Sequence, residues 1–355
     1  MIATGSSGGH MVPALALADV LRSRGHEVVL AGAFDRLPGM VADLNMPVYH
    51  IQASPLQGKS LTTIFKLSAS MLQSVQKAGR LIAEQNPAAV IGFGGYAAFA
   101  VVMSAALRRL PVMIHEQNVR PGRANRLLMP WVRRIAVSFE ETRRFCPRRK
   151  CCVTGYPLRR YPRISQEDAR RRMGLAEDAS TVLVCGGSQG SRAVNRIMTS
   201  ACNELVKKSP AVQFIHIAGE QDRELVETAY RKSGVRARVY SFCDDMAGAY
   251  CAADAVVIRA GAGALHEAVY FDRPAVVIPY PYARGHQMEN ALALRKRFSG
   301  LTVIPEERAA ADSVAEALQA ALRREKTGED REDFMRAADR LAAEIERLAE
   351  VKHGH

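Results

Sequence analysis

The chain begins MIATGSSGGHMVPALALADVL (residues 1–21), which joins a short apolar run to an alanine-rich helix through a glycine-rich loop. Gly5, Gly8 and Gly9 have no Cβ, so the backbone N–H groups of this loop can approach a ligand closely. A helix that starts near Met11 would direct its positive end at the same loop. The loop does not match the GxGxxG pattern of dinucleotide-binding proteins, so by itself it indicates either a turn or an anion site.

The same order of elements recurs along the chain and decides the fold class. Short β-branched runs without polar residues precede glycine-rich breaks and amphipathic or alanine-rich helices, a pattern typical of strands covered by helices on both faces. The runs that predict strands are residues 28–32, 88–92, 112–115, 135–138, 181–186, 212–218, 237–242, 255–259 and 275–279. We therefore expect an α/β fold with two doubly wound parallel-sheet domains.

The boundary between the domains is expected in TGYPLRRYPRIS (residues 154–165), where two prolines and a basic cluster interrupt the periodicity. The last segment, Glu332 to Val351, predicts a charged amphipathic helix. Residues 88–107 contain no charge and are long enough to form a membrane-spanning helix. The glycines at positions 92, 94 and 95 favour a strand, a turn and a buried helix there instead.

Charge is distributed unevenly along the chain. Residues 1–163 contain 22 lysines and arginines against 8 acidic residues, whereas residues 164–355 contain 27 against 28. A basic first half indicates an anionic partner such as a bilayer surface, a phosphorylated substrate or nucleic acid. We do not expect nucleic acid, because aromatic residues make up only 6% of the chain and are not interleaved with the basic ones.

The seven cysteines are scattered and lack any metal-binding spacing, so we expect reduced thiols in a cytosolic setting. No cleavable leader is expected, because a glycine loop follows Met1 within a few residues.

A second glycine loop, CGGSQGSRAVN (residues 185–195), follows a predicted strand and opens a predicted helix. Its N–H groups and the hydroxyls of Ser188 and Ser191 suit a diphosphate. It lacks the lysine of an ATP-binding P-loop. A simple strand-to-helix turn is the alternative interpretation.

Three more clusters follow predicted strands, where ligands bind in open parallel sheets. RAGAGALHEA (residues 259–268) offers a carboxylate for ribose hydroxyls at Glu267, and PYPYARGHQMEN (residues 279–290) places two amides on one helix face, suited to neutral hydroxyls. HEQN (residues 115–118) adds polar side chains in the first domain. Any one of these clusters could instead be a helix cap or a core polar group.

Taken together, these segments resemble the motifs of the MurG family, the bacterial N-acetylglucosaminyltransferases of peptidoglycan synthesis. The matching segments occur in the family's order from residue 2 to about residue 300: GSSGGHMVPALALA, GFGGY, HEQNVRPGRANRLL, TGYPLR, GGSQGSRAVN, DDMAGAYCAADAVVIRAGAGALHE and HQMENA. One departure is GSSGGH where the family usually has GGTGGH, but Ser7 keeps the hydroxyl.

The resemblance implies the GT-B architecture, with two Rossmann-like domains facing across a cleft. Residues 1–159 would form an N-terminal domain on the side of the lipid acceptor and the membrane. Residues 160–337 would bind UDP-N-acetylglucosamine, and residues 338–355 would form a C-terminal helix that packs back on the N-terminal domain.

The resemblance also assigns site residues. His10 and Glu116 are the candidate general bases. The loop from Ser7 to His10 would also line the acceptor side, together with Tyr96 and Asn195, and Phe242 would lie beside the uracil. The residues expected to bind UDP-N-acetylglucosamine are Ser7, Gly8, Gly9, Asn118, Arg159, Ser188, Cys243, Arg259, Ala262, Gly263, Ala264, Leu265, His266, Glu267, Gln287 and Asn290.

The implied reaction is inverting transfer of N-acetylglucosamine from UDP to the 4-hydroxyl of undecaprenyl-diphosphate-linked N-acetylmuramoyl-pentapeptide (lipid I), giving lipid II and UDP. An imidazole at a helix N-terminus stays largely unprotonated, so His10 is expected to accept the hydroxyl proton, with Glu116 as the rival base. No DxD motif is present, so we expect metal-independent chemistry without a cofactor. The alternatives are a glycolipid synthase acting on diacylglycerol, a UDP-N-acetylglucosamine epimerase of GT-B fold, and a catalytically silent nucleotide-sugar-binding module.

A lipid acceptor would keep the enzyme at a membrane. The segment Thr62 to Ile82 is amphipathic, with Lys66 and Lys77 available for anionic headgroups, and Trp131 is followed by Arg133 and Arg134. We expect either a docking surface for an anionic bilayer or an ordinary helix packed on the core. Docking would make the chain a peripheral protein on the cytoplasmic face of the plasma (inner) membrane, where cell-wall synthesis and division proteins are further partners implied by the resemblance.

Overall fold

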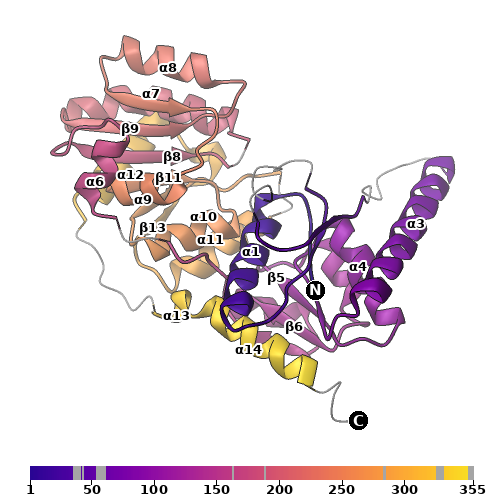
Figure 1. Cartoon of the computed structure of the whole chain (residues 1–355). Helices are drawn as coiled ribbons and strands as arrows, with labels where there is room; N and C mark the ends of the chain where they lie inside the picture. The colour runs from indigo at the N-terminus through magenta and orange to yellow at the C-terminus, as the bar shows by residue number, and fades with distance from the viewer. Residues whose placement is uncertain are drawn as a thin grey trace. The chain divides into compact units, whose positions relative to one another are not determined.

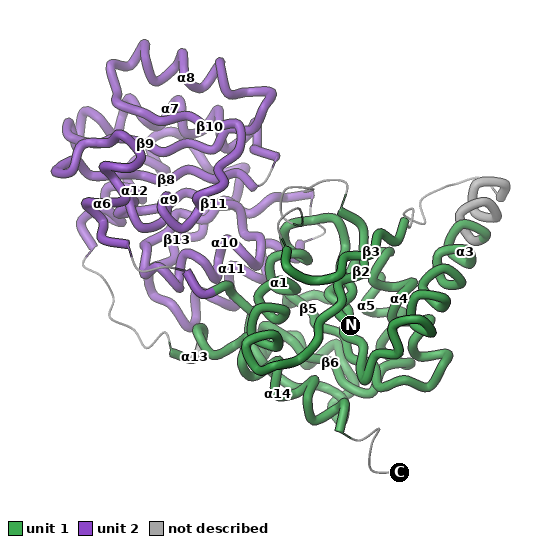
Figure 2. The backbone as a smooth tube through the Cα atoms, viewed as in Figure 1, with its two compact units in different colours: residues 1–159, 332–355 green, residues 160–331 purple. Residues whose placement is uncertain are grey.

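The computed structural model describes residues 1–34, 41, 44–52, 61–161, 164–187, 189–282, 285–324 and 332–350, with the backbone alone at residues 61–68 and 333. The chain forms two compact units (Figures 1 and 2), unit 1 from residues 1–159 and 332–355 and unit 2 from residues 160–331. The chain re-enters unit 1 at residue 332, whereas the boundary expected from the sequence lies at 337/338. The two differ because the short helix Glu332–Met335, which precedes the C-terminal helix, also belongs to unit 1.

Unit 1 is built on a seven-stranded sheet in which every neighbouring pair is parallel. In spatial order the strands are β3 (Val48–His50), β2 (Leu30–Gly32), β1 (Ile2–Thr4), β4 (Val90–Gly92), β5 (Val112–Glu116), β6 (Arg134–Val137) and β7 (Cys151–Val153). The order reverses between β1 and β4, which is the switch point where ligands bind in doubly wound sheets.

The helices of unit 1 cover the apolar strands and bury them. They are α1 (Gly8–Ser23), α3 (Leu61–Gln85), α4 (Tyr96–Leu107), α5 (Arg123–Leu128), the 3-10 helix η1 (Glu140–Phe145), α13 (Glu332–Met335) and α14 (Ala337–Glu350). Met71 and Val75 of α3 pack on the core, whereas Leu72 is exposed. The apolar stripe of α3 is therefore partly used inside unit 1.

The C-terminal helix α14 packs on α1 within unit 1 (Figure 1). Leu341 and Ile345 enter the same core cluster as Leu17 of α1. Arg24 adds ion pairs of 3.0 Å to Asp339 and 2.7 Å to Glu346 at the rim of this contact. The last helix of the chain thus completes the core of the first domain.

Unit 2 is built on a six-stranded parallel sheet of the same winding. Its spatial order is β10 (Ala237–Tyr240), β9 (Val212–Ile217), β8 (Ser180–Cys185), β11 (Ala255–Ile258), β12 (Ala275–Val277) and β13 (Leu301–Val303). Here the order reverses between β8 and β11, so the second switch point lies between those strands.

The helices of unit 2 are α6 (Gln166–Arg172), α7 (Arg192–Lys208), α8 (Arg223–Lys232), α9 (Met246–Ala252), α10 (Ala262–Tyr270), α11 (His286–Arg295), the 3-10 helix η2 (Glu306–Arg308) and α12 (Ala311–Leu322). Helices α7 and α12 pack together over the sheet, where Met198 and Leu318 join Val184 and Val257 in one buried cluster.

All nine predicted strands are present, and each end lies within two residues of its predicted position. The uncharged run 88–107 divides into β4, a glycine turn and α4, as its glycines indicate. Within the described residues, no helix is long and apolar enough to cross a membrane. The predicted C-terminal helix is interrupted at Arg336 into α13 and α14.

Candidate active site

The switch point of unit 1 brings two glycine loops into backbone contact. The loop after β1 contains Gly5, and the loop after β4 contains Gly94 and Gly95, both with positive φ angles of 91° and 85°. A Cβ on Gly95 would lie 2.8 Å from the Cα of Gly5, so neither loop has room for a side chain there. The GFGGY segment therefore supports the first glycine loop.

His10 lies in the first turn of α1, because the helix starts at Gly8 and not near Met11 as expected. Its Nδ1 atom is 3.0 Å from the Oγ atom of Ser7. Gly94 lies on the other side of the imidazole, where a Cβ would be 3.1 Å from Nε2. Burial lowers the pKa of His10 from 6.5 to about 4, so the imidazole is neutral at neutral pH.

Glu116 ends β5 and is buried, and four hydrogen bonds surround its carboxylate. Oε1 accepts from the backbone N–H of Asn118 at 2.9 Å and from its side-chain amide at 3.2 Å. Oε2 accepts from the N–H of Gly122 at 3.0 Å and from Nδ2 of Asn125 at 2.8 Å. Burial raises the pKa of Glu116, and these hydrogen bonds oppose that shift. The carboxylate thus organises the loop that follows β5.

Asn125 was not among the residues predicted from the sequence. It is buried on α5 and donates to Glu116 and to the carbonyl of His115, at 3.1 Å. Its amide also lies near Gly94, whose Cβ would be 3.7 Å away. Asn125 thereby connects the loop after β5 to the glycine loop after β4. Only its place in the segment HEQNVRPGRAN (residues 115–125) could have suggested this role.

The other predicted residues of unit 1 fall into two groups. Tyr96 opens α4 directly after Gly95, close to the glycine loops. Arg159 instead lies beside Asp19, with Nε 3.9 Å from Oδ2. Asp19 is eleven residues beyond Gly8 along α1, which separates them by about 16 Å. Within unit 1, the structure therefore groups Ser7, Gly8, Gly9, His10, Tyr96, Glu116 and Asn118, and leaves Arg159 outside that group.

The switch point of unit 2 carries the second glycine loop. Ser188 lies outside the described residues. Ser191 caps α7 by accepting from the N–H of Val194 at 3.5 Å. Gly190 has a φ of 73°, and the carbonyl oxygen of Ala218 occupies the position of its absent Cβ. The helix N-terminus predicted here is present, but the Ser191 hydroxyl is already engaged inside the unit.

Arg259 follows β11 and joins four segments of unit 2. Its guanidinium donates to Ser191 Oγ at 2.8 Å and to the carbonyl of Ile278 at 3.1 Å. It also forms an ion pair of 2.5 Å with Glu306, a residue that the sequence did not single out. Only 8% of the Arg259 side chain is exposed. Arg259 therefore fixes the loops around the switch point through contacts within unit 2.

Helix α10 follows β11 and has an open N-terminus at the carboxyl end of that strand. Its N-cap, Gly261, makes no side-chain cap hydrogen bond, and a Cβ there would meet no atom within 4 Å. The N–H of Leu265 bonds to Gly261, which leaves the earlier N–H groups of this turn, Ala262 to Ala264, oriented as an anion site.

Two predicted side chains of α10 are engaged within unit 2. Tyr161 donates its hydroxyl to Oε1 of Glu267 at 3.2 Å, and burial raises the pKa of that carboxyl. His266 is buried, with Nδ1 2.7 Å from the carbonyl of Ala262. Burial lowers the pKa of His266 to about 4.

Of the remaining predicted residues of unit 2, Gln287 and Asn290 lie on α11, and Cys243 lies between β10 and α9. Gln287 accepts from the N–H of Tyr280 at 2.9 Å, and Asn290 is buried and donates to the carbonyl of Ala260 at 3.3 Å. Cys243 is buried in the segment that follows β10, whereas its neighbour Phe242 is exposed.

All seven cysteines are described, and none forms a disulfide.

Asn195 does not fit the acceptor role expected for it. Its Nδ2 donates to the carbonyl of Ala218 and to Oδ2 of Asp222, both at 2.9 Å. Its Oδ1 is 3.0 Å from Nε2 of His216, and the residue is buried. An acceptor contact through this side chain would have to break bonds that hold α7 to the loop after β9.

No group of three or more His, Cys, Asp and Glu side chains in the described part of the chain is placed to hold a metal ion.

Comparison with known proteins identifies the class to which this fold and these loops belong. The pattern of the glycosyltransferase family 28 N-terminal domain matches residues 1–137, and that of the family's C-terminal domain matches residues 181–347. Together they cover both doubly wound units. The fold is the GT-B fold of two Rossmann-like domains.

Full-length relatives narrow the family further. The UDP-N-acetylglucosamine--N-acetylmuramyl-(pentapeptide) pyrophosphoryl-undecaprenol N-acetylglucosamine transferase of Myxococcus xanthus (strain DK1622) is 37% identical over 83% of this chain and 77% of its own length. The protein of the same name from Pelobacter propionicus (strain DSM 2379 / NBRC 103807 / OttBd1) is 35% identical over 90% of each chain. The crystal structure of Acinetobacter baumannii MurG superposes with a TM-score of 0.72 at 25% identity over 98% of each chain. The chain therefore belongs to glycosyltransferase family 28 and, within it, to the MurG family of N-acetylglucosaminyltransferases.

Proposed function

We propose that this chain transfers N-acetylglucosamine from UDP-N-acetylglucosamine to the 4-hydroxyl of lipid I, producing lipid II and UDP. The relatives whose names state this activity match the chain over most of its length. The observation that carries the proposal is the neutral, oriented imidazole of His10 at the switch point of unit 1, in a chain that has a second switch-point loop in unit 2.

We assign UDP-N-acetylglucosamine to unit 2. The open N–H groups at the start of α10 and the N-terminus of α7 would bind the diphosphate, which carries the charge of the leaving group. Glu267 would accept a ribose hydroxyl, with Tyr161 orienting its other oxygen. Arg259 would act by fixing the loops of the site through Ser191 and Glu306, because its guanidinium is already engaged there.

We assign the acceptor and the base to unit 1. When Nδ1 of His10 donates its proton to Ser7, Nε2 carries the lone pair on the side of Gly94. Nε2 would take the proton of the 4-hydroxyl as that oxygen bonds to the anomeric carbon and the bond to the UDP oxygen breaks, which inverts the configuration. The electron pair of the broken bond leaves with UDP, and the proton stays on His10 until solvent removes it.

A pKa of about 4 makes His10 a weak base in the free protein. The diphosphate of the bound acceptor would raise that pKa, because a nearby negative charge stabilises the protonated imidazole. Glu116 would position the loop after β5, since each of its two carboxylate oxygens already accepts two hydrogen bonds.

We further propose that the reaction needs no metal ion, because the helix N-termini would stabilise the leaving diphosphate and the sequence has no DxD motif. Turnover should then be unchanged in excess EDTA. Loss of turnover in EDTA that a divalent ion restores would overturn this assignment.

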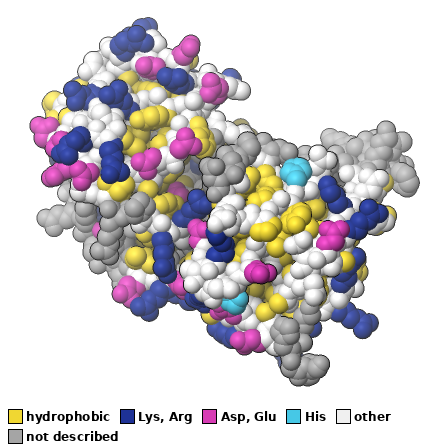
Figure 3. Space-filling view, viewed as in Figure 1, with side chains coloured by type: hydrophobic (Ala, Val, Ile, Leu, Met, Phe, Trp, Pro, Cys, Tyr) yellow, Lys and Arg dark blue, Asp and Glu magenta, His cyan; other side chains and the backbone are white. Residues whose placement is uncertain are grey.

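We also propose that unit 1 docks on the cytoplasmic face of the plasma membrane. Leu72 and Trp131 are exposed apolar side chains, and Lys77, Arg133 and Arg134 are exposed cations of the same unit. On the face drawn in Figure 3, hydrophobic side chains reach the surface of unit 1 among charged ones. Reversal of the charges of Lys77, Arg133 and Arg134 should weaken binding to anionic liposomes and its salt dependence, and unchanged binding would count against docking.

The experiment that tests the function compares acceptors. Purified chain is incubated with labelled UDP-N-acetylglucosamine and either lipid I, diacylglycerol or no acceptor. Transfer to lipid I alone supports the proposal. Transfer to diacylglycerol would indicate a glycolipid synthase, and conversion of the nucleotide sugar without an acceptor would indicate an epimerase.

A further inference from the structure

Strand β10 forms one edge of the unit 2 sheet, and within the described residues no strand pairs with its outer side. The carbonyls of Arg236 and Tyr240 accept from Phe214 and Ala218, so these residues direct their backbone groups toward β9. Alternate residues of a strand direct their backbone groups to opposite sides. The N–H and C=O groups of Ala237 and Val239 therefore point outward, along the open edge.

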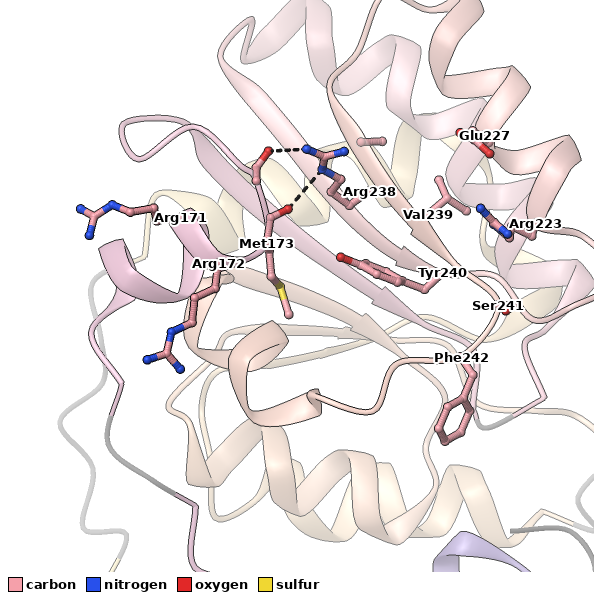
Figure 4. Close-up of a pocket in the computed structure, with 12 residues that line it drawn as sticks. Arg171, Arg172, Met173, Arg223, Glu227, Arg238, Val239, Tyr240, Ser241 and Phe242 are labelled. Atoms are coloured by element: carbon pink, nitrogen blue, oxygen red, sulfur yellow. Dashed lines mark hydrogen bonds between the residues drawn. The ribbon is translucent and has the colours of Figure 1, made fainter. Parts of the chain in front are cut away.

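This edge forms part of a groove rather than a flat surface. A cavity of about 630 Å³ lies along β10 and is continued by a second of about 420 Å³ toward Val235. Figure 4 shows Arg238 and Tyr240 directed toward the side of Met173, at the end of α6, and Val239 toward Glu227 and Arg223 of α8. The groove thus has β10 along its length, with the end of α6 on one side and α8 on the other.

The groove is strongly basic, although the second half of the chain is almost neutral, with 27 basic and 28 acidic residues in 164–355. Glu227 is the one acidic residue among those that line the two cavities. The basic residues that line them are Arg171, Arg172, Arg223, Arg231, Arg236 and Arg238.

Most of these arginines are not neutralised within unit 2. Arg171 is paired with Asp168 and Glu177, and Arg238 donates to the carbonyls of Met173 and Gly174, at 3.1 Å each (Figure 4). Within the described residues, no carboxylate lies within ion-pair distance of the remaining four, Arg172, Arg223, Arg231 and Arg236, and all four are exposed. The groove therefore has cationic groups available for an anionic occupant.

We propose that the β10 edge of unit 2 binds an extended, acidic segment of a partner protein by strand addition. The backbone of that segment would bond to Ala237 and Val239, and its carboxylates would meet the exposed arginines. The four residues of β10 span about 13 Å, so the paired part of the segment would be about four residues long. An anionic bilayer has no peptide N–H and C=O groups that could pair with an open strand edge, whereas an extended peptide segment has them. The open edge therefore favours a peptide over a bilayer.

Arginines on an edge strand can also act only to prevent unwanted strand pairing. That alternative predicts no affinity for an acidic strand, so a binding measurement separates the two interpretations.

The probe is a fluorescein-labelled, end-capped peptide of nine alternating glutamate and valine residues, and binding to the full chain is followed by fluorescence anisotropy. A second peptide of the same sequence carries N-methyl groups on alternate residues, which keeps its charge but blocks strand addition. Vesicles of phosphatidylglycerol test for a bilayer surface.

Two variants of the chain test the two components of the site. Val239→Pro removes an outward N–H while leaving the neighbours that pair with β9. The double variant Arg172→Glu/Arg236→Glu reverses charge without changing the backbone. Arg196→Glu, on the exposed side of α7, is the matched control for charge reversal. Ser241 and Phe242 are left unchanged, because they adjoin the proposed nucleotide site.

We expect the unmodified peptide to bind and each of the two test variants to weaken it by about tenfold, the equivalent of one to two backbone hydrogen bonds. Arg196→Glu should bind like the wild type, and amide exchange at Ala237 and Val239 in the wild-type chain should slow when the peptide is present. This exchange measurement keeps the test decisive if Val239→Pro fails to fold.

Three results would overturn the proposal. Failure of the peptide to bind would leave the arginines as protection of the edge. Equal binding of the N-methylated peptide would mean charge attraction without strand addition. Vesicle binding that is lost in the charge-reversal variant, with no peptide binding, would make the groove a bilayer contact.

Discussion

The Nδ1 atom of His10 lies 3.0 Å from the Oγ atom of Ser7, the N-cap residue of the same helix. Ser7 makes no side-chain cap hydrogen bond to the backbone of α1, so its hydroxyl orients the imidazole instead. The serine that departs from the family's usual threonine thus keeps a role that needs only the hydroxyl.

Replacement of Ser7 by alanine should lower kcat by about tenfold while changing the free energy of unfolding by less than about 0.5 kcal/mol, because no cap hydrogen bond is lost. Ser7→Thr should restore kcat. Initial rates with lipid I and urea denaturation of the three proteins provide the check. A large loss of stability in Ser7→Ala would show that the hydroxyl serves the helix and not His10.

Glu116→Gln should destabilise unit 1 by about 1–3 kcal/mol, because an amide cannot accept the four hydrogen bonds that the carboxylate accepts. We expect a higher KM for lipid I and a smaller change in kcat, measured alongside urea denaturation. A loss of kcat of about a thousandfold without a change in stability would instead identify Glu116 as the base.

Glu306→Gln should weaken UDP-N-acetylglucosamine binding through Arg259, which contacts both Glu306 and Ser191. We also expect a loss of stability of about 1–3 kcal/mol, because a mostly buried guanidinium loses its carboxylate partner. Calorimetric titration with the nucleotide sugar measures the first effect. Glu307→Gln, at the exposed neighbouring position, is the control, and equal effects in both variants would exclude a specific role for Glu306.

The buried His216 should make unit 2 sensitive to acid. Burial lowers its pKa from 6.5 to about 3 in the folded chain, with Nδ1 3.0 Å from the Tyr230 hydroxyl and Nε2 3.0 Å from Asn195. The unfolded chain therefore binds the proton first, so the contribution of this group to stability is complete above pH 6.5 and is lost as pH falls toward 3.

Relative to His216→Gln, the wild-type free energy of unfolding should fall by up to about 1.4 kcal/mol per pH unit below pH 6.5. Urea denaturation between pH 7 and pH 4.5 measures this difference. Parallel curves for the two proteins would contradict the shift in the pKa of His216.

The sequence predicts the fold well because the strands of the sheet interiors are uninterrupted apolar runs. Val182 to Val184 and Val256 to Ile258 are completely buried, and short, uninterrupted β-branched runs of this kind are typical of strands covered on both faces. Outside the nine predicted strands lie β1, β3, β7 and β13, each of three residues. Strands β3, β7 and β13 are edge strands, where partly exposed positions weaken the apolar signal.

The candidate site is predicted less well, because a motif does not reveal which polar groups the fold itself uses. In the sequence, Asn195 and Arg259 are both polar residues beside glycine loops, which suggests that they bind a ligand. In the structure, both side chains are hydrogen-bonded to other groups of unit 2. Glu306 is far along the chain from Arg259, so only the folded chain reveals their ion pair. Asn125 is nine residues from Glu116, but no motif marks it as the partner of that carboxylate.

The central claim, that the chain transfers N-acetylglucosamine to lipid I with His10 as the base, is tested most directly by one measurement. Steady-state transfer from labelled UDP-N-acetylglucosamine to lipid I is compared in the wild type and His10→Gln, with calorimetric binding of the nucleotide sugar to both. We predict transfer by the wild type, a loss of kcat of about 10²–10⁴-fold in the variant, and unchanged nucleotide-sugar binding. Turnover of lipid I by His10→Gln at nearly the wild-type rate, or no transfer by the wild type, would contradict the account.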